Sequence, residues 1–257
     1  MVILTGVKAI YIHIHKTGGE SIEHSLTQIE SPDDVFLDVE HPADSAQFEL
    51  RYGLSKHSSA LKVAQTIELA NWDTYYTWAT VRNPYARVAS IYNYMASISE
   101  PHLTSIGFPS NASHQAQLNW IKSARYPLQK QWVFGGVRAY LATRASVTPF
   151  SDFLRSPVLR SDEPAILSQF SRLCNASSNR LLVKRVVKLE NLSDEWGQVC
   201  EEMGLPPINL LLRNETPSRW KRSVSDLFMD KADIDLVDTW HAADFDWFGY
   251  ERGTIKK

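Results

Sequence analysis

The sequence predicts an α/β fold in which a parallel β-sheet is flanked by helices. Apolar and polar side chains alternate over residues 10–14, as in a strand, and apolar residues then recur at helical spacing over residues 22–29. A second strand is expected at residues 75–81 (YYTWATV), and an amphipathic helix at residues 85–97 follows it. A further strand is expected at residues 180–189. Strands that alternate with helices in this way favour a parallel sheet covered on both faces.

Weaker signals suggest the elements between these units. A short strand is expected at residues 35–39, and a capped helix at residues 58–71. Residues 43–56 are ambiguous, and we expect them to be mostly loop. Another capped helix is expected from Ser193 to Gly204. No repeat or linker divides the chain, so residues 1–257 are expected to form a single domain.

Composition and charge favour some classes of protein over others. The net charge of −2 gives no indication of nucleic-acid or anionic-membrane binding. Cys174 and Cys200 are too few for a zinc site or a disulfide framework, and we expect both to be buried. No apolar run is long enough for a transmembrane helix, and residues 1–15 do not resemble a signal peptide. We therefore expect a cytoplasmic protein, with a trimmed luminal domain as the alternative because four glycosylation acceptor patterns occur.

The turn after the first strand carries the residue types that bind phosphate. Gly18 and Gly19 would let the backbone approach a ligand, and the following helix would direct its N-terminal N–H groups at it. Lys16 supplies a positive charge, and Thr17 and Ser21 supply hydroxyl donors. The GxxxxGK[ST] pattern of nucleotide triphosphatases is absent, because the lysine here precedes the glycines. The alternative is a glycine-rich hairpin or an ordinary strand-to-helix turn.

A second basic residue follows the strand at residues 75–81. Arg82 occupies the turn, and Ser90 lies about two turns along the helix that follows. Ligands of parallel α/β sheets bind at the carboxyl ends of the strands, so Lys16 and Arg82 could hold two anionic groups of one ligand. The alternative is that Arg82 pairs with a carboxylate such as that of Glu190.

Both motifs resemble those of sulfotransferases that use 3′-phosphoadenosine 5′-phosphosulfate (PAPS). The segment HIHKTGGESI resembles their 5′-phosphosulfate loop, and VRNPYARVASIYNY resembles their 3′-phosphate element. VKLENL and ADFDWFGY resemble segments of the carbohydrate-type branch, so the likeness extends from about residue 10 to residue 250. The resemblance implies a P-loop-like sulfotransferase fold and transfer of a sulfuryl group from PAPS to an acceptor hydroxyl, expected on a carbohydrate, with 3′,5′-adenosine bisphosphate (PAP) as the product and no metal.

The resemblance also implies roles for individual residues. The 5′-phosphosulfate would be held by Lys16, Thr17, Gly18, Gly19, Glu20 and Ser21. The 3′-phosphate would be held by Arg82 and Ser90. A basic loop with Arg219, Trp220 and Lys221 would close over the nucleotide.

His57 stands where hexuronic-acid 2-O-sulfotransferases have a catalytic histidine, and Glu40 and Asp38 are the alternative bases. Lys16 would also be catalytic, because it would lie where negative charge develops on the leaving phosphate oxygen.

Two residues depart from the family pattern, and they keep other functions open. His15 replaces a proline, and Glu20 replaces a threonine and brings a negative charge to the phosphate loop. The carboxylate of Glu20 must turn away from the phosphates, or the donor binds weakly. The alternatives are a nucleotide or small-molecule kinase and a catalytically inactive nucleotide-binding homologue.

Overall fold

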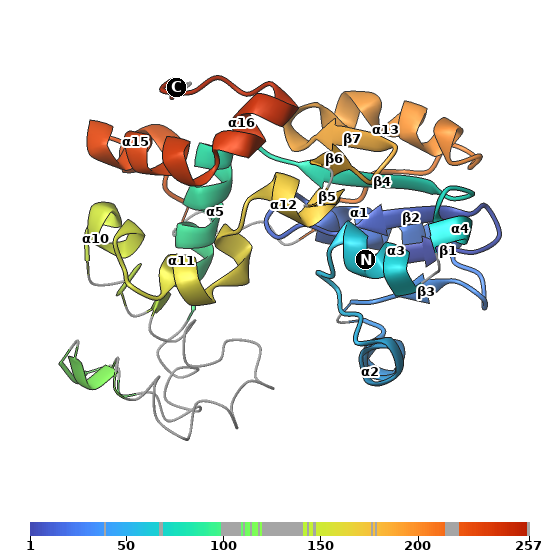
Figure 1. The fold of residues 1–257 in the computed structure, drawn as a ribbon, viewed down its shortest axis with the longest axis horizontal. Coiled ribbons are helices and arrows are strands. Elements are labelled where there is room, and N and C mark those ends of the chain that lie inside the picture. The colour runs from blue at the N-terminus through green and yellow to red at the C-terminus, as the bar shows by residue number, and fades with distance from the viewer. Residues whose placement is uncertain are drawn as a thin grey trace. The chain divides into compact units, whose positions relative to one another are not determined.

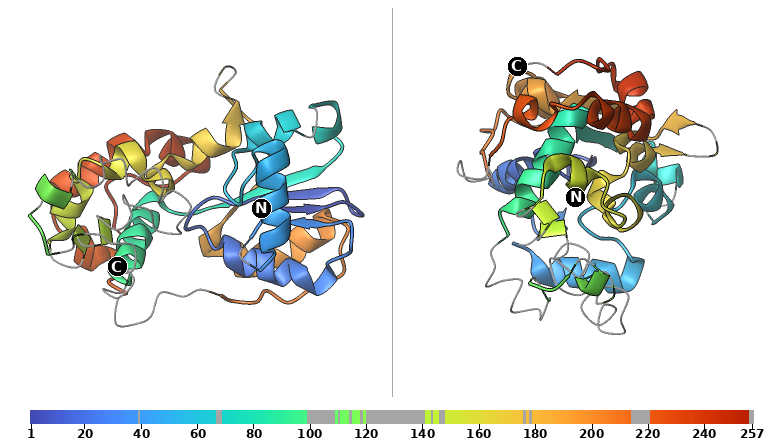
Figure 2. Two further views of the ribbon diagram at one scale, coloured as in Figure 1. Left: turned by 90° about the horizontal axis from the view of Figure 1, so that it is seen from below. Right: turned by 90° about the vertical axis from the view of Figure 1, so that its left-hand side faces the viewer.

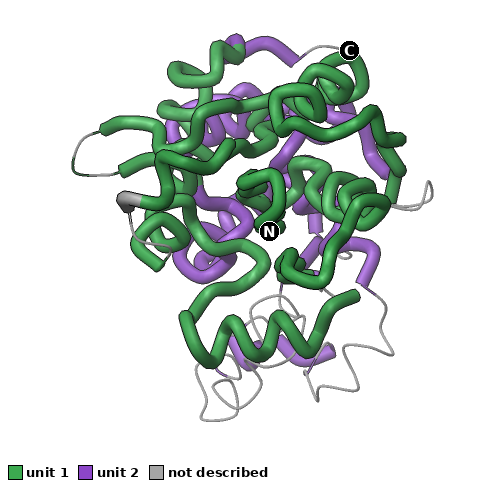
Figure 3. The backbone as a smooth tube through the Cα atoms, turned by 90° about the vertical axis from the view of Figure 1, so that its right-hand side faces the viewer, with its two compact units in different colours: residues 1–84, 168–215, 241–250 green, residues 85–167, 216–240, 251–257 purple. Residues whose placement is uncertain are grey.

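The computed structural model describes residues 1–38, 40–66, 69–98, 109, 111–113, 115–117, 119, 141–142, 144–145, 148–175, 177, 179–213 and 221–255. Contacts within the chain define two compact units, which Figure 3 distinguishes by colour. The first unit comprises residues 1–84, 168–215 and 241–250, and the second comprises residues 85–167, 216–240 and 251–257. The expectation of a single domain over residues 1–257 stays a prediction.

The first unit contains a five-stranded mixed sheet, which confirms the α/β prediction. Its strand order is β3-β1-β2-β4-β7 (Figure 1). The strands are β1 (Val2–Leu4), β2 (Ala9–Ile12), β3 (Val35–Phe36), β4 (Tyr76–Val81) and β7 (Arg185–Lys188). The central strands β2, β4 and β7 run parallel, whereas β1 is antiparallel to both of its neighbours. The carboxyl ends of β2 and β4, where the two basic turns begin, therefore lie at the same edge of the sheet.

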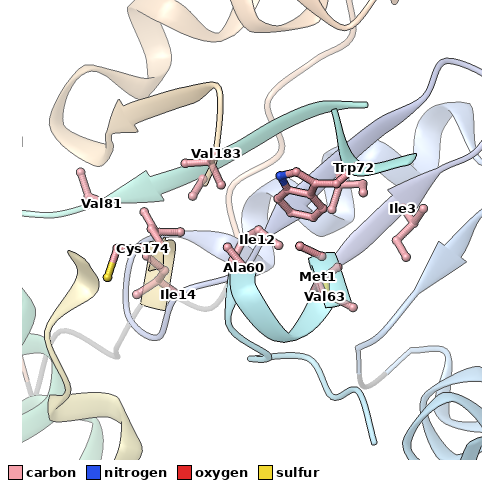
Figure 4. Packing of buried hydrophobic residues seen from close by; sticks show 14 of the residues in the cluster. Met1, Ile3, Ile12, Ile14, Ala60, Val63, Trp72, Val81, Cys174 and Val183 are labelled. Carbon is pink, nitrogen blue, oxygen red and sulfur yellow. The ribbon is translucent and has the colours of Figure 1, made fainter. Parts of the chain in front are cut away.

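The alternating side chains of the central strands fill two separate cores. Ile10 and Ile12 join a cluster on one face, where they pack with residues of α3 (Ala60–Thr66), α12 (Gln169–Leu173) and α16 (Ala242–Phe248). Figure 4 shows this cluster, with Ile12 near Ala60. Ala9 and Tyr11 face the other side and pack with residues of α1 (Gly19–Leu26) and α13 (Leu192–Glu202). Figure 2 shows these two helices, in blue and orange, as ribbons beside the sheet. The predicted sheet covered on both faces is confirmed.

The remaining helices of the first unit include one that we did not expect. They are η1 (Thr27–Ile29), α2 (Pro42–Tyr52), α4 (Leu69–Trp72) and η3 (Leu189–Asn191). The prediction of a mostly looped segment at residues 43–56 is wrong, because α2 occupies most of it. Pro42 stands at the start of this helix and Gly53, with φ of 63°, ends it. No residue of α2 is buried, so its sequence lacks the apolar stripe that would have indicated a helix.

The prediction of one strand over residues 180–189 is also wrong, because the segment is divided between two sheets. Arg180–Leu181 forms β6, which pairs antiparallel with β5 (Cys174–Asn175) in a small separate sheet. Only Arg185–Lys188 enters the large sheet, as β7. Val183, between the two strands, is buried in the first core. The segment gives no local sign of such a bend, because it contains neither glycine nor proline and its β-branched residues favour a strand throughout.

The second unit is helical in its described residues. Its elements are α5, which begins at the boundary (Pro84–Ala96), α10 (Phe150–Leu154), α11 (Leu159–Asp162), η2 (Pro164–Ile166), α14 (Val224–Leu227) and α15 (Lys231–Trp240). Tyr92 packs edge-on against Phe150 and Phe153, and Phe150 also packs edge-on against Phe228. The buried guanidinium of Arg87 donates hydrogen bonds to the carbonyl oxygens of Ala165 and Leu167. None of the helices described in either unit is long and apolar enough to cross a membrane.

Candidate functional site

The turn between β2 and α1 holds an unusual backbone conformation. Lys16 has a φ of 65° and Gly18 a φ of 83°, so both lie in the left-handed region. Such a conformation is uncommon for a lysine, and strained backbone of this kind gathers at ligand-binding sites. The carbonyl oxygen of Gly18 accepts the N–H groups of Ser21 and Ile22 at 3.1 and 3.3 Å, which starts α1 immediately after the turn.

Each glycine of the turn is required for a different reason. A Cβ atom on Gly18 would combine a positive φ with an approach of 2.6 Å to Cδ1 of Leu189. A Cβ atom on Gly19 would lie 2.2 Å from the imidazole of His13, which packs against the backbone there. The turn is therefore a narrow backbone cradle at the N-terminus of a helix, and such a cradle can bind an anion.

The hydroxyl groups of the turn form hydrogen bonds within the protein. Thr17 is fully buried and donates from Oγ1 to the carbonyl oxygen of Ile14 at 2.9 Å. Ser21 accepts the N–H of Arg213 at 2.9 Å and donates to the carbonyl oxygen of Arg213 at 3.3 Å. Because a hydroxyl has a single proton to donate, contact of Thr17 with a ligand is left to its backbone N–H. That Ser21 donates a hydrogen bond to a bound phosphosulfate stays a prediction.

The structure brings Arg82 to the glycine turn. Its guanidinium Nη1 donates to the carbonyl oxygen of Lys16 at 3.4 Å. The backbone of Arg82 is fixed by the side-chain amide of Gln169, which accepts its N–H and donates to its carbonyl oxygen, both at 2.8 Å. Asp244 is fully buried and accepts the N–H of Gln169 at 3.0 Å, so the first turn of α16 supports the same turn. The two basic elements predicted from the sequence therefore meet at one edge of the sheet.

The carboxylate of Glu190 contacts the neighbours of Arg82. It accepts the N–H of Asn83 at 2.8 Å and the hydroxyl of Tyr250 at 3.0 Å. Burial lowers the pKa of Arg82, and the attraction of Glu190 opposes this shift. Glu190 thus shapes the turn and helps to keep Arg82 charged. The carboxylate oxygens of Glu190 already accept hydrogen bonds from Asn83 and Tyr250. This weighs against the alternative that Arg82 serves mainly to pair with Glu190.

His57 is one of three imidazoles that lie together beside the glycine turn. Its ring stacks on that of His15 with centroids 3.5 Å apart, and it meets His13 edge-on at 4.5 Å. Its Nδ1 is 3.1 Å from the carbonyl oxygen of His13. Because a carbonyl can only accept, Nδ1 carries the proton and Nε2 is the basic nitrogen in the neutral ring. Burial, with the nearby His13 and His15, holds the pKa of His57 well below its usual value, so the ring is neutral at physiological pH.

The two alternative bases are committed to other contacts. Asp38 accepts the N–H groups of Glu40 and His41 at 2.8 and 2.9 Å, and Nδ1 of His41 also lies 2.9 Å from it. Glu40 pairs with the guanidinium of Arg213. Asp38 therefore shapes its own loop, and Glu40 fastens that loop to the segment that leads toward residues 214–220.

The side chain of Glu20, the unexpected acid of the turn, forms an ion pair. Its Oε1 lies 3.2 Å from Nζ of Lys56. The same ammonium lies 3.2 Å from Oε2 of Glu23, one turn further along α1. The charge of Glu20 is thus partly offset by a residue adjacent to His57 in the sequence.

Other predicted site residues lie outside this arrangement. Ser90 on α5 and Lys221 belong to the second unit, so their places in the site stay predictions. Arg219 and Trp220 fall outside the described residues.

Sequence reasoning also missed residues that hold the site together. They are His13, Glu23, Lys56, Gln169 and Asp244. The spacing of Glu20 and Glu23 on one face of a helix was the one signal available, because it calls for a nearby cation.

Comparison with known proteins agrees with this geometry. A model of one protein family, described as "Sulfotransferase family", matches residues 2–251. Neither the curated proteins nor the solved structures give a match to this chain. The match spans both basic turns, α16 and the segment between them.

Proposed function

Because the chain belongs to the sulfotransferase family, we propose that it moves the sulfuryl group of PAPS to a hydroxyl of a carbohydrate or glycoconjugate. Membership supports sulfuryl transfer in general, and the family generally uses PAPS as its donor. The observation that carries the proposal is the meeting of Arg82 with the backbone of Lys16. It joins two cationic elements at the edge of the sheet where ligands of α/β folds bind.

The turn has the chemical character that a phosphosulfate requires. Lys16 supplies a full charge, and the backbone of residues 17–21 supplies N–H groups at the start of α1. PAPS, when bound, would supply a sulfuryl group whose departure leaves negative charge on the 5′-phosphate oxygen. Lys16 and the N–H groups would stabilise that charge more in the transition state than in the ground state. Arg82 would bind the 3′-phosphate.

His57 would be the general base. Its hydrogen bond to His13 makes Nε2 the proton acceptor, and its lowered pKa keeps it neutral at physiological pH. The acceptor hydroxyl would attack sulfur as the S–O bond to the phosphate breaks, and its proton would pass to Nε2. The neighbouring rings of His13 and His15 limit the directions from which an acceptor can approach this nitrogen. We propose that this reaction takes place in the cytoplasm.

The kinase alternative and the inactive homologue make different predictions for ligand binding. PAP without metal should raise the melting temperature of the protein by several degrees at saturating concentration, because it binds only the folded state. A kinase would instead be stabilised by ATP with Mg²⁺. A protein that PAP stabilises, but that releases no PAP from PAPS with any acceptor of a carbohydrate array, would be the inactive homologue. Failure of PAP to bind would contradict the proposal itself.

Replacement of the base should separate binding from turnover. We expect His57→Gln to lower kcat by about 10²- to 10⁴-fold, because the acceptor hydroxyl loses its proton acceptor. The affinity of the variant for PAP should stay within about twofold of the wild type, because PAP carries no acceptor hydroxyl for His57 to contact. Calorimetry and initial rates measure the two quantities, and His24→Gln on α1 is the matched control. A His57→Gln enzyme with full activity would place the base elsewhere.

A further inference from the structure

Lys56 lies between two carboxylates of the helix that begins at the glycine turn. Its Nζ is 3.2 Å from Glu20 and 3.2 Å from Glu23. The side chains of Lys56 and Glu23 are 17% and 3% exposed, so neither charge is well screened by water, whereas Glu20 is 38% exposed. Burial would lower the pKa of Lys56, but the two carboxylates outweigh it and raise the pKa. One ammonium thus contacts both acids, and Oε1 of Glu23 is also paired with the N-terminal ammonium of Met1.

The position of Glu20 conflicts with anion binding at the turn. It lies in the first turn of α1, where the backbone N–H groups and the helix dipole favour a negative ligand. An uncompensated carboxylate there would repel an incoming phosphosulfate and compete for the same favourable potential. Anion binding at the turn therefore requires a nearby cation that offsets the charge of Glu20 and is not itself used to bind the ligand.

We propose that Lys56 is a positioning residue that offsets the charge of Glu20 and so allows the turn to bind a phosphosulfate. This inference rests on the proposed function. It makes Lys56 and Glu20 a matched pair, in which the lysine is required because the glutamate is present.

The same lysine connects the phosphate turn to the histidine. Glu23 binds Nδ1 of His13 at 2.7 Å, and the carbonyl oxygen of His13 holds Nδ1 of His57. Lys56 precedes His57 in the chain, so its ion pairs fasten the segment that carries the base to α1. Loss of the lysine is therefore expected to affect both donor affinity and turnover, whereas loss of Glu20 should affect donor affinity alone.

The test is a double-mutant cycle with PAP as the probe. We expect Lys56→Met to weaken PAP binding about tenfold in calorimetry at low ionic strength. The double variant Lys56→Met/Glu20→Gln should recover most of that loss, because the repelling charge is gone. The loss should shrink as salt is added. Lys62→Met, the same substitution on α3, is the matched control and should bind PAP as the wild type does.

Two further variants keep the test decisive if Lys56→Met does not fold. Lys56→Arg retains the charge and should bind PAP within about twofold of the wild type. Glu20→Gln alters an exposed side chain, and it should tighten PAP binding about twofold to threefold at low salt.

Two outcomes would overturn the inference while the proposed function stands. One is a wild type that binds PAP and a folded Lys56→Met that binds it equally well. The other is no change in affinity with Glu20→Gln. A wild type that does not bind PAP would instead overturn the proposed function.

Discussion

His13 shows how one residue can serve three parts of a site. Its ring packs against the backbone of Gly19, its Nδ1 binds the buried carboxylate of Glu23, and its carbonyl oxygen orients His57. From the sequence, His13 is simply a polar residue in an alternating strand. Its 4% exposure shows that it faces inward, where it fixes the distance between the glycine turn and the base. Alternation alone could not reveal this, because it gives the side of a strand and not the partner.

Among single residues, Lys16 should be indispensable for turnover. We expect Lys16→Ala to lower kcat by about 10²- to 10³-fold, because the variant loses the charge that stabilises the leaving phosphate. Initial rates with PAPS and an active acceptor measure the effect. Lys8→Ala is the matched control, since Lys8 is also a lysine with a left-handed backbone, at a φ of 53°, but lies in the turn between β1 and β2. A Lys16→Ala enzyme with near wild-type kcat would contradict the mechanism.

At the scale of elements, the sequence predicted the parts whose side chains alternate or repeat. The alternation at Ala9–Ile12 and the apolar stripe of α13 correctly located β2 and its covering helix. The bend near Val183 was missed because no glycine or proline marks it, and α2 was missed because none of its residues is buried. The short β1 was missed because three apolar residues carry no period. Periodicity thus reveals an element only where apolar residues alternate with polar ones or recur at a fixed spacing.

We expect that a side chain at Gly19 in the glycine turn is not tolerated, whereas a side chain at Gly197 in α13 is. Gly19→Ala places a Cβ 2.2 Å from the ring of His13, so we expect a loss of about 1–3 kcal/mol in the free energy of unfolding and a loss of PAP affinity. Gly197→Ala in α13 is the control, because nothing lies within 4 Å of its Cβ and alanine favours the helix. It should gain about 0.5–1 kcal/mol.

Urea unfolding and PAP titration of both glycine variants measure these effects. Equal destabilisation of the two would show that the ring of His13 does not limit the turn.

At the scale of the molecule, the site depends on residues that are far apart in the sequence. Lys16, Arg82, Gln169 and Asp244 meet through the sheet topology and through hydrogen bonds of 2.8–3.4 Å. The sequence predicted the first two, because each follows a strand and carries a charge. Gln169 and Asp244 had no local signal, since a buried amide and a buried carboxylate derive their function from what they contact. The net charge of −2 likewise gives no sign that Lys16 and Arg82 meet at the turn.

The half-buried position of His57, beside two other imidazoles, should make the whole protein less stable in mild acid. Its pKa in the folded state is well below the ordinary value of about 6.5, because burial and the neighbouring His13 and His15 disfavour its charged form. As the pH falls below about 6.5, the unfolded chain therefore binds a proton that the folded chain does not, and stability is lost until the folded pKa is reached. His41 acts in the opposite sense, since Asp38 and Glu30 outweigh its burial and raise its pKa.

Comparison with His57→Gln isolates this contribution, because His41 is common to both proteins. Between about pH 7 and pH 5, we expect urea unfolding to show a loss of stability about 1 kcal/mol larger in the wild type than in the variant. Carboxylates contribute little to the difference, because they titrate mainly below this range. Identical pH dependence in the two proteins would mean that His57 accepts a proton in the folded state as readily as in the unfolded chain. In that case the surroundings of His57 would not keep its ring neutral, and the ring would not be ready to take the proton of the substrate hydroxyl.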